Sequence, residues 1–222
     1  MIDKWPPPTI ADVDAVIALS PVQGPYLPWS AGAMRPAGLV TALNEIAGNG
    51  YERIVECGGG ISSVFIARLL AQKEKGTLLT LEIDKRWERW LMSQLRDEVL
   101  DKYATVVSAP LKPCPRVAED VDWYSLDAVE DALEGLQDIQ LLLVDGPPAY
   151  EEGKGLARLP ALPVLHDALA PDASIVLDDI GRPGEQEVLR RWEDEFSISF
   201  EIRDAAAVAV TRLGDMLPFP RI

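Results

Sequence analysis

The sequence has few of the residues that mark disulfide-rich, membrane-spanning or secreted proteins. Its 222 residues include 2 cysteines, Cys57 and Cys114, which are too few for a disulfide framework. No apolar stretch reaches the roughly 20 residues that a membrane-spanning helix needs. No apolar segment follows Lys4, as a secretory signal would require. We therefore expect a cytoplasmic protein without a membrane partner.

Positive charge is also scarce. The chain has 21 lysines and arginines against 36 aspartates and glutamates, which gives a formal net charge of −15. Enzymes that act on DNA or RNA usually present a basic surface to the phosphate backbone, so we expect no nucleic-acid partner. The hydrophobic content of 48% is ordinary, and the length suits one domain with a sizeable core.

Apolar segments and helical patterns alternate after residue 50. Such alternation predicts a parallel sheet with helices on both faces. Strands are expected at 52–57, 77–82, 103–108, 139–145 and 174–179, and helices at 62–74, 85–98, 155–170 and 184–195.

Two further strands are expected at 197–203 and 206–212. Only two residues separate them, which is too short for a crossover helix, so they must pair antiparallel. The predicted fold class is therefore α/β, a doubly wound, seven-stranded sheet in which only the last strand is antiparallel. That last strand should insert beside the fifth strand.

The first 50 residues have a different character. They are rich in proline between residues 6 and 36, with one helix expected near 10–19 and another from Pro36 to about Ala47. We expect a single domain over 1–222, in which 1–50 form a helical arm and lid and 51–214 form the core.

The most informative segment reads Glu56-Cys-Gly-Gly-Gly-Ile-Ser-Ser. A strand ends in an acid, the chain turns through three glycines, and a helix begins. Glycines let the backbone approach a ligand closely, and the free N–H groups of the helix point into the same crevice. The second strand ends at Glu82, where a carboxylate is placed to accept hydrogen bonds from a ribose diol. The sequence therefore predicts a nucleoside-containing cofactor.

A nicotinamide dinucleotide is less favoured. Its G-x-G-x-x-G fingerprint would need a glycine where Ser63 stands, and the carboxylate of Glu56 would repel a pyrophosphate. An NAD-dependent oxidoreductase is thus the weaker alternative. A cofactor-binding scaffold without catalytic activity is another alternative that the sequence leaves open.

The glycine segment resembles the E/D-x-G-x-G motif of class I methyltransferases, which use S-adenosylmethionine. The sheet expected here, with its reversed last strand, is also similar to theirs. Leu143-Val-Asp-Gly-Pro-Pro and Leu177-Asp-Asp-Ile resemble a subgroup that includes the cation-dependent small-molecule O-methyltransferases. The resemblance extends from about residue 25 to residue 213 and implies a Rossmann-like methyltransferase.

The resemblance also implies site residues. In the cation-dependent subgroup, acids at the ends of the fourth and fifth strands bind Mg²⁺, and Asp145, Asp178 and Asp179 stand at those positions. Asp145 and Asp178 are the catalytic candidates. Without a metal, they could cap the following turns or act directly as bases. The expected cofactor-binding residues are Glu56, Gly58, Gly60, Ser62, Ser63, Glu82, Ile83, Ala109 and Asp145.

The implied reaction is O-methylation of a hydroxyl on a small molecule or a sugar, with Mg²⁺ as a candidate second cofactor. The (D/N)-P-P-(Y/F) motif of N-methyltransferases does not match, because Gly146 and Ala149 interrupt it. Trp29, Trp123 and Tyr124 are candidate walls of an acceptor pocket. A homodimer is one assembly that the sequence leaves open, and no motif identifies the acceptor.

Overall fold

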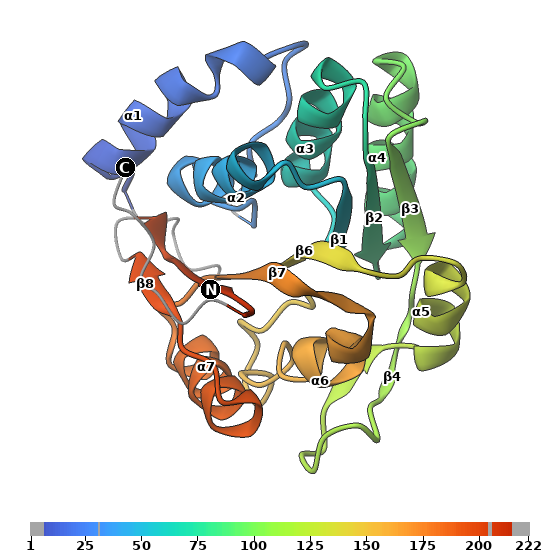
Figure 1. Cartoon of the computed structure of the whole chain (residues 1–222), viewed down its shortest axis with the longest axis vertical. Coiled ribbons are helices and arrows are strands. Elements are labelled where there is room, and N and C mark those ends of the chain that lie inside the picture. The colour runs from blue at the N-terminus through green and yellow to red at the C-terminus, as the bar shows by residue number, and fades with distance from the viewer. Residues whose placement is uncertain (1–6, 31, 204–205, 215–222) are drawn as a thin grey trace.

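The computed structural model describes residues 7–30, 32–203 and 206–214. Its core is a seven-stranded sheet with strand order β3-β2-β1-β6-β7-β9-β8 (Figure 1). The strands are β1 (Arg53–Cys57), β2 (Thr77–Glu82), β3 (Ala104–Ser108), β6 (Ile139–Val144), β7 (Leu169–Asp178), β8 (Glu201–Arg203) and β9 (Val208–Arg212). A separate two-stranded sheet pairs β4 (Leu111–Pro113) with β5 (Asp122–Tyr124).

The pairing confirms the predicted topology. Strands β1, β2, β3, β6 and β7 pair in parallel. Strand β9 pairs antiparallel with β7 on one side and with β8 on the other. The last strand of the chain is therefore inserted beside the fifth strand of the expected series, and its antiparallel pairing with β8 fits the short connection between them.

Helices cover both faces of the sheet (Figure 1). The helices α2 (Pro36–Asn49), α3 (Ile61–Gln72) and α4 (Lys85–Asp97) lie on one face, with α1 (Ile10–Ala18) packed on α2. The other face carries α5 (Leu126–Leu133), α6 (Ala161–Leu165) and α7 (Pro183–Phe196). Two short 3₁₀ helices, η1 (Ser20–Val22) and η2 (His166–Ala168), complete the elements.

Alternate residues of the central strands supply the two hydrophobic cores. In β6, Leu141 and Leu143 belong to the core under α2 and α3, whereas Leu142 and Val144 belong to the core under α6 and α7. Successive side chains of a strand point to opposite faces. Because both faces are covered, β6 is apolar at nearly every position, as expected for a central parallel strand.

Residues typical of helix termini stand at both ends of α2 and at the start of α4. Pro36 occupies the first turn of α2, and Gly50 ends the helix in the left-handed conformation with φ 69°. The side chain of Asp84 accepts hydrogen bonds from the N–H groups of Arg86 and Trp87 and so caps α4. Among the described residues, no helix is both long and apolar enough to cross a bilayer.

Several expected boundaries were wrong. The helix expected at 155–170 is reduced to α6 and η2, because proline lacks the N–H that a helix interior needs and Pro160 stands directly before α6. Only 201–203 of the expected strand at 197–203 is extended, because α7 continues to Phe196 and Ser197 ends it with φ 53°. Asp179 lies just past β7 rather than within it.

A close backbone contact joins the ends of β1 and β6. A Cβ atom added to Gly146 would lie 2.6 Å from the Tyr124 hydroxyl and 2.8 Å from the Gly58 Cα. We expect Gly146→Ala to lower the free energy of unfolding by about 1–3 kcal/mol through overpacking. The measurement is denaturant unfolding.

Gly48→Ala in α2 is the matched control, because nothing lies within 4 Å of a Cβ added there. Its stability should be unchanged or up to about 1 kcal/mol higher, since alanine favours a helix more than glycine does. Equal unfolding midpoints for Gly146→Ala and the wild-type protein would show that this contact does not constrain the strand ends.

Candidate active site

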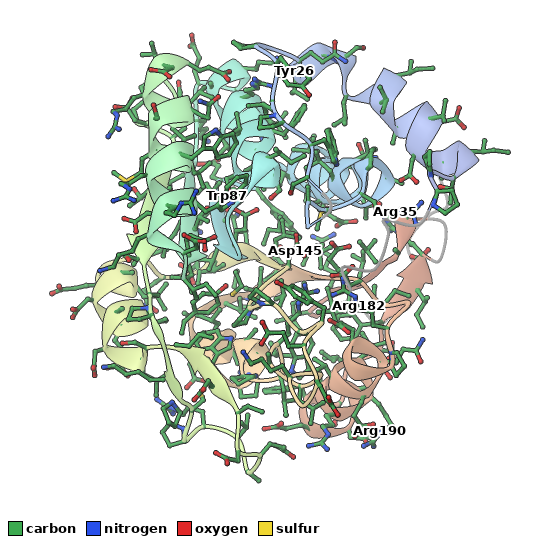
Figure 2. All side chains as sticks on the ribbon, turned by 180° about the vertical axis from the view of Figure 1, so that it is seen from behind. Tyr26, Arg35, Trp87, Asp145, Arg182 and Arg190 are labelled. Carbon is green, nitrogen blue, oxygen red and sulfur yellow. The ribbon has the colours of Figure 1, made fainter. Side chains whose placement is uncertain are left out.

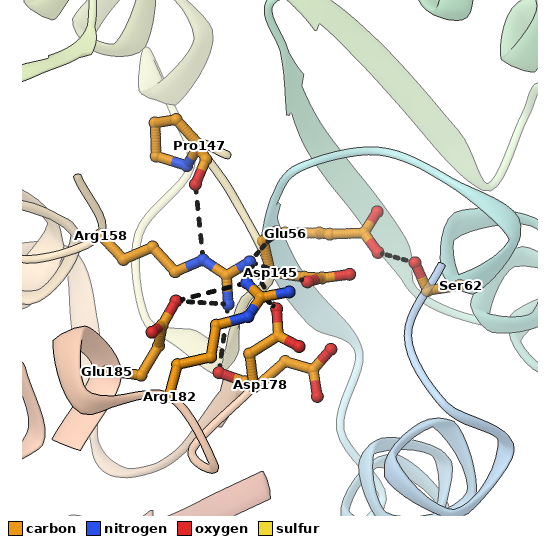
Figure 3. A network of polar contacts seen from close by, with 9 residues as sticks. Glu56, Ser62, Asp145, Pro147, Arg158, Asp178, Arg182 and Glu185 are labelled. Carbon is orange, nitrogen blue, oxygen red and sulfur yellow. Dashed lines mark hydrogen bonds and ion pairs between the residues drawn. The ribbon is translucent and has the colours of Figure 1, made fainter. Parts of the chain in front are cut away.

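The carboxylate of Glu56 is fully buried below the glycine turn. It accepts a hydrogen bond from the hydroxyl of Ser62 at 2.5 Å (Figure 3). The hydroxyls of Ser63 and of Thr80, the latter at 2.8 Å, also donate to it. Burial raises the pKa of Glu56 to about 7, although the three hydroxyls lower it in part. Glu56 thus ties the first turn of α3 to β2 from beneath, and its contacts are with these hydroxyls rather than with the crevice.

Glu82 binds the backbone at the tip of β2. Its Oε1 accepts the N–H groups of Ile83 and Asp84, each at 2.7 Å, and its Oε2 accepts the N–H of Gly59 at 3.1 Å. A carboxylate offers about four lone-pair positions. Three are therefore used, and one position remains for a further donor such as a ribose hydroxyl.

Glycine allows the turn to pass close to its neighbours. Gly58 has φ 92°, and its N–H donates to the carbonyl of Leu81 at 3.0 Å. The indole N–H of Trp87 donates to the carbonyl of Gly59 at 2.6 Å, which holds α4 against the turn. Sequence reasoning did not single out Trp87, although its place three residues after the Asp84 cap puts it in the first turn of α4.

A small crevice separates the glycine turn from the arm. It has a volume of about 70 Å³, and Trp87 and Asp145 face it from different elements (Figure 2). Small-molecule pockets usually measure about 300 Å³ or more, so the arm covers this end of the sheet closely. The lining residues are Ser30, Gly32, Ala33, Met34, Gly59, Gly60, Ile61, Ser62, Trp87 and Asp145.

The expected cofactor-binding residues fall into two groups, those that line the crevice and those that do not. Gly60, Ser62 and Asp145 line the crevice. Ser63 and Ala109 are fully buried, and the N–H of Ala109 donates to the carbonyl of Glu82 at 2.8 Å. Neither Ser63 nor Ala109 lines the crevice, although the Ser63 hydroxyl accepts the N–H of Gly60, which does.

Three aspartates meet at the ends of β6 and β7. Each of Asp145, Asp178 and Asp179 offers a carboxylate oxygen, and these oxygens lie within 4.8 Å of one another. Burial, followed by the neighbouring negative charges, raises the pKa of Asp145 well above its usual range and that of Asp178 to about 7. Their proximity therefore favours the protonated form of one of the two carboxyl groups.

Arg158 lies within this acidic group and was missed by sequence reasoning. Only 3% of its side chain is exposed. Its Nη2 donates to the Asp145 carbonyl at 2.8 Å, to Asp145 Oδ1 at 3.2 Å and to Asp179 Oδ2 at 3.0 Å (Figure 3). The fold thus brings Arg158 to the acids from a segment 13 residues after Asp145 and 20 residues before Asp178. A single charge in the apolar segment 156–162 was the available signal.

Arg182 and Glu185 complete the charged group at the start of α7. Arg182 Nη1 lies 2.7 Å from Asp179 Oδ2, and Glu185 Oε1 lies 3.6 Å from the nearest nitrogen of each arginine. The candidate acceptor walls Trp123 and Tyr124 are instead buried in the core beside α5. Trp29 is half-buried in the arm and packs near Phe65.

The acidic group is chemically suited to a divalent cation. Carboxylate oxygens are the ligands that Mg²⁺ prefers. With all four acids ionised, Asp145, Asp178, Asp179 and Glu185 outweigh the two arginines by two negative charges. A divalent cation would neutralise that excess, and Asp145, Asp178 and Asp179 are the residues that fit it.

Comparison with known families and structures identifies the family and the fold. Residues 55–180 match a family model described as a methyltransferase domain. No curated protein sequence matches the chain significantly.

Solved structures share the fold at low sequence identity. A Podospora anserina methyltransferase with bound S-adenosylhomocysteine is 12% identical, with a TM-score of 0.63 over 93% of this chain and 89% of that one. A Bacillus cereus O-methyltransferase, in complex with the same compound, is 15% identical, with a TM-score of 0.58 over 93% and 92%. The Streptomyces achromogenes O-methyltransferase TomG, in complex with S-adenosylmethionine, is 19% identical, with a TM-score of 0.54 over 93% and 91%.

Glu56 should make stability depend on pH. Its pKa rises from 4.5 to about 7 on folding, so the folded protein binds the extra proton. The resulting stabilisation is fully present below about pH 4.5 and is lost as the pH rises through 7, at up to about 1.4 kcal/mol per pH unit. Glu56→Gln should remove this part of the pH dependence in urea unfolding between pH 4.5 and pH 8.

Glu74→Gln, at an exposed position, serves as the control and should follow the wild-type curve. If the curves of Glu56→Gln and the wild-type protein ran parallel over this range, Glu56 would not be the group that titrates.

Proposed function

The chain belongs to the methyltransferase domain family, and from that premise we propose that it transfers the methyl group of S-adenosylmethionine to a hydroxyl of a small molecule or a sugar. The observation that carries this proposal is the position of Asp145. It lines the crevice beside the glycine turn and also belongs to the acidic group at the ends of β6 and β7. One residue thus joins the expected donor site to a group that can accept a proton.

The glycine turn and β2 would bind the donor. The remaining acceptor position of Glu82 suits a ribose hydroxyl, and Ile61 and Ser62, at the start of α3, line the crevice. S-adenosylmethionine carries a positive sulfonium, which the nearby carboxylates would stabilise. The bound ligands of the similar Streptomyces and Bacillus structures support the choice of donor.

Asp145 and Asp178 would serve as the base. In the transfer, the acceptor oxygen forms a bond to the methyl carbon while the carbon–sulfur bond breaks and its electron pair stays on sulfur. The acceptor proton passes to the carboxylate pair, whose raised pKa values suit proton transfer near neutral pH. Holding acceptor and donor in line supplies the rest of the rate enhancement.

Mg²⁺ is a second component of the proposal. Asp145, Asp178 and Asp179 would hold it. When bound, it would supply a Lewis acid that favours the deprotonated form of the acceptor hydroxyl. Without it, Asp145 acts on the acceptor directly, and the two routes differ in their response to chelation.

Glu82 is the residue to test for donor binding. Glu82→Ala should weaken binding of S-adenosylhomocysteine by about 1–3 kcal/mol, because the ribose loses a hydrogen bond to a charged group. Isothermal titration calorimetry gives the value. Glu74→Ala, at an exposed position away from the crevice, should bind as the wild-type protein does.

NADH should not bind either protein. Wild-type affinity of Glu82→Ala for S-adenosylhomocysteine would remove Glu82 from the ribose role, and binding of NADH would favour the oxidoreductase alternative.

Asp178 is the residue to test for catalysis. Asp178→Ala should abolish transfer of a labelled methyl group to a panel of phenols and sugars, whereas its affinity for S-adenosylhomocysteine should change little, because the crevice lining does not include Asp178. Chelation of the wild-type enzyme tests the metal in the same assay. Reversible loss of activity would support Mg²⁺, and full activity in chelator would leave direct base catalysis by Asp145.

A further inference from the structure

Two arginines and two acids form a closed ring of ion pairs beside the catalytic candidates. Asp179 Oδ2 lies 3.0 Å from Arg158 Nη2 and 2.7 Å from Arg182 Nη1. Glu185 Oε1 lies 3.6 Å from Nη1 of each arginine, which closes the ring. We call these four residues the arginine–carboxylate ring. It joins the segment before α6, the end of β7 and the first turn of α7 (Figure 3).

Arg158 connects this ring to the backbone of both catalytic strands. Its Nη1 donates to the Asp178 carbonyl at 3.1 Å, and its Nε donates to the Pro147 carbonyl at 3.4 Å. Nη2 binds both the carbonyl and Oδ1 of Asp145. One guanidinium therefore fixes the ends of β6 and β7 relative to each other. It also binds one of the two carboxylate oxygens of Asp145, Oδ1.

The arginine–carboxylate ring should contribute little to stability, because several of its charged atoms are buried without complete hydrogen bonding. Both carboxylate oxygens of Glu185 and Nη1 of Arg182 are buried without a hydrogen-bond partner among the described residues. Buried ion pairs with incomplete hydrogen bonding are often no more stabilising than apolar side chains of similar volume. The ring is neutral in itself when its four members are charged, so it places a guanidinium beside Asp145 without adding net charge to the site.

We propose that Arg158 is a positioning residue for methyl transfer, which holds the Asp145 carboxylate at the crevice, with Asp179 and Glu185 as its counter-charges. This inference rests on the proposed function of Asp145. Its geometric basis is the planar fork of the guanidinium, which reaches Asp145, Asp178 and Asp179 at once. An ammonium group is a compact point charge and cannot span these partners.

Arg158→Lys tests the fork while keeping the positive charge. We expect the turnover number with an acceptor from the hydroxyl panel to fall about 10- to 100-fold, because small displacements of a reacting group cost that much. The Kd of S-adenosylhomocysteine should change less than about threefold. A crystal structure of Arg158→Lys with S-adenosylhomocysteine should show the Asp145 carboxylate turned from its wild-type position.

Arg190→Lys is the matched control. Arg190 is on α7 and, like Arg158, pairs with more than one acid, here Glu187 and Asp194, but it lies at the periphery (Figure 2). It should retain wild-type turnover. Glu185→Gln is the second variant, in case Arg158→Lys does not fold. It removes one counter-charge at nearly constant shape and should lower turnover by a smaller factor than Arg158→Lys, with the Kd of S-adenosylhomocysteine unchanged.

The outcomes separate this inference from the proposed function. If Asp145→Asn is inactive while Arg158→Lys, or Glu185→Gln in its place, turns over at the wild-type rate, the positioning role is overturned and the proposed function stands. If Asp145→Asn transfers methyl groups at the wild-type rate, the catalytic role proposed for Asp145 fails, and the positioning role of Arg158 fails with it. If no member of the panel accepts a methyl group, the crystal structure of Arg158→Lys with S-adenosylhomocysteine tests the positioning role. An Asp145 carboxylate in its wild-type position in the variant overturns the positioning role.

Discussion

Burial of carboxylates at one edge of the parallel sheet is the constraint on which the rest of the site depends. Glu56, Glu82, Asp145, Asp178 and Glu185 are each largely withdrawn from water at the carboxyl ends of the strands or next to them. An ionised acid is costly there unless other groups compensate it. The surrounding loops, helix starts and arginines are arranged to supply that compensation.

The compensation differs between the two halves of the edge. Hydroxyls and backbone N–H groups, which carry no net charge, compensate Glu56 and Glu82 in one half. Guanidinium groups compensate Asp145 and Asp179 in the other half. Asp145 lies at the boundary, because it also lines the crevice beside the glycine turn.

The arm adds a steric condition to this electrostatic one. Ser30, Gly32, Ala33 and Met34 leave a crevice of only about 70 Å³ above the glycine turn. Two arginines hold the arm on either side of these residues. Arg68 binds Glu98 and the carbonyl of Pro25, and Arg35 pairs with the buried Asp12. The segment between these contacts therefore covers the crevice, and it belongs to the part of the chain that the sequence predicts to be a lid.

The sequence by itself determined the sheet. The alternation of strands and helices, the two-residue link before the last strand and the glycines after Glu56 specify a parallel sheet with one reversed strand, because each acts through local geometry. It also placed Asp145, Asp178 and Asp179 together, because the ends of adjacent parallel strands share an edge. Only the tertiary structure decided what those acids contact. Arg158 comes from a segment that looked helical, and Arg182 and Glu185 reach the group from the start of α7. Charge compensation depends on distances in space, and spacing along the chain does not encode them.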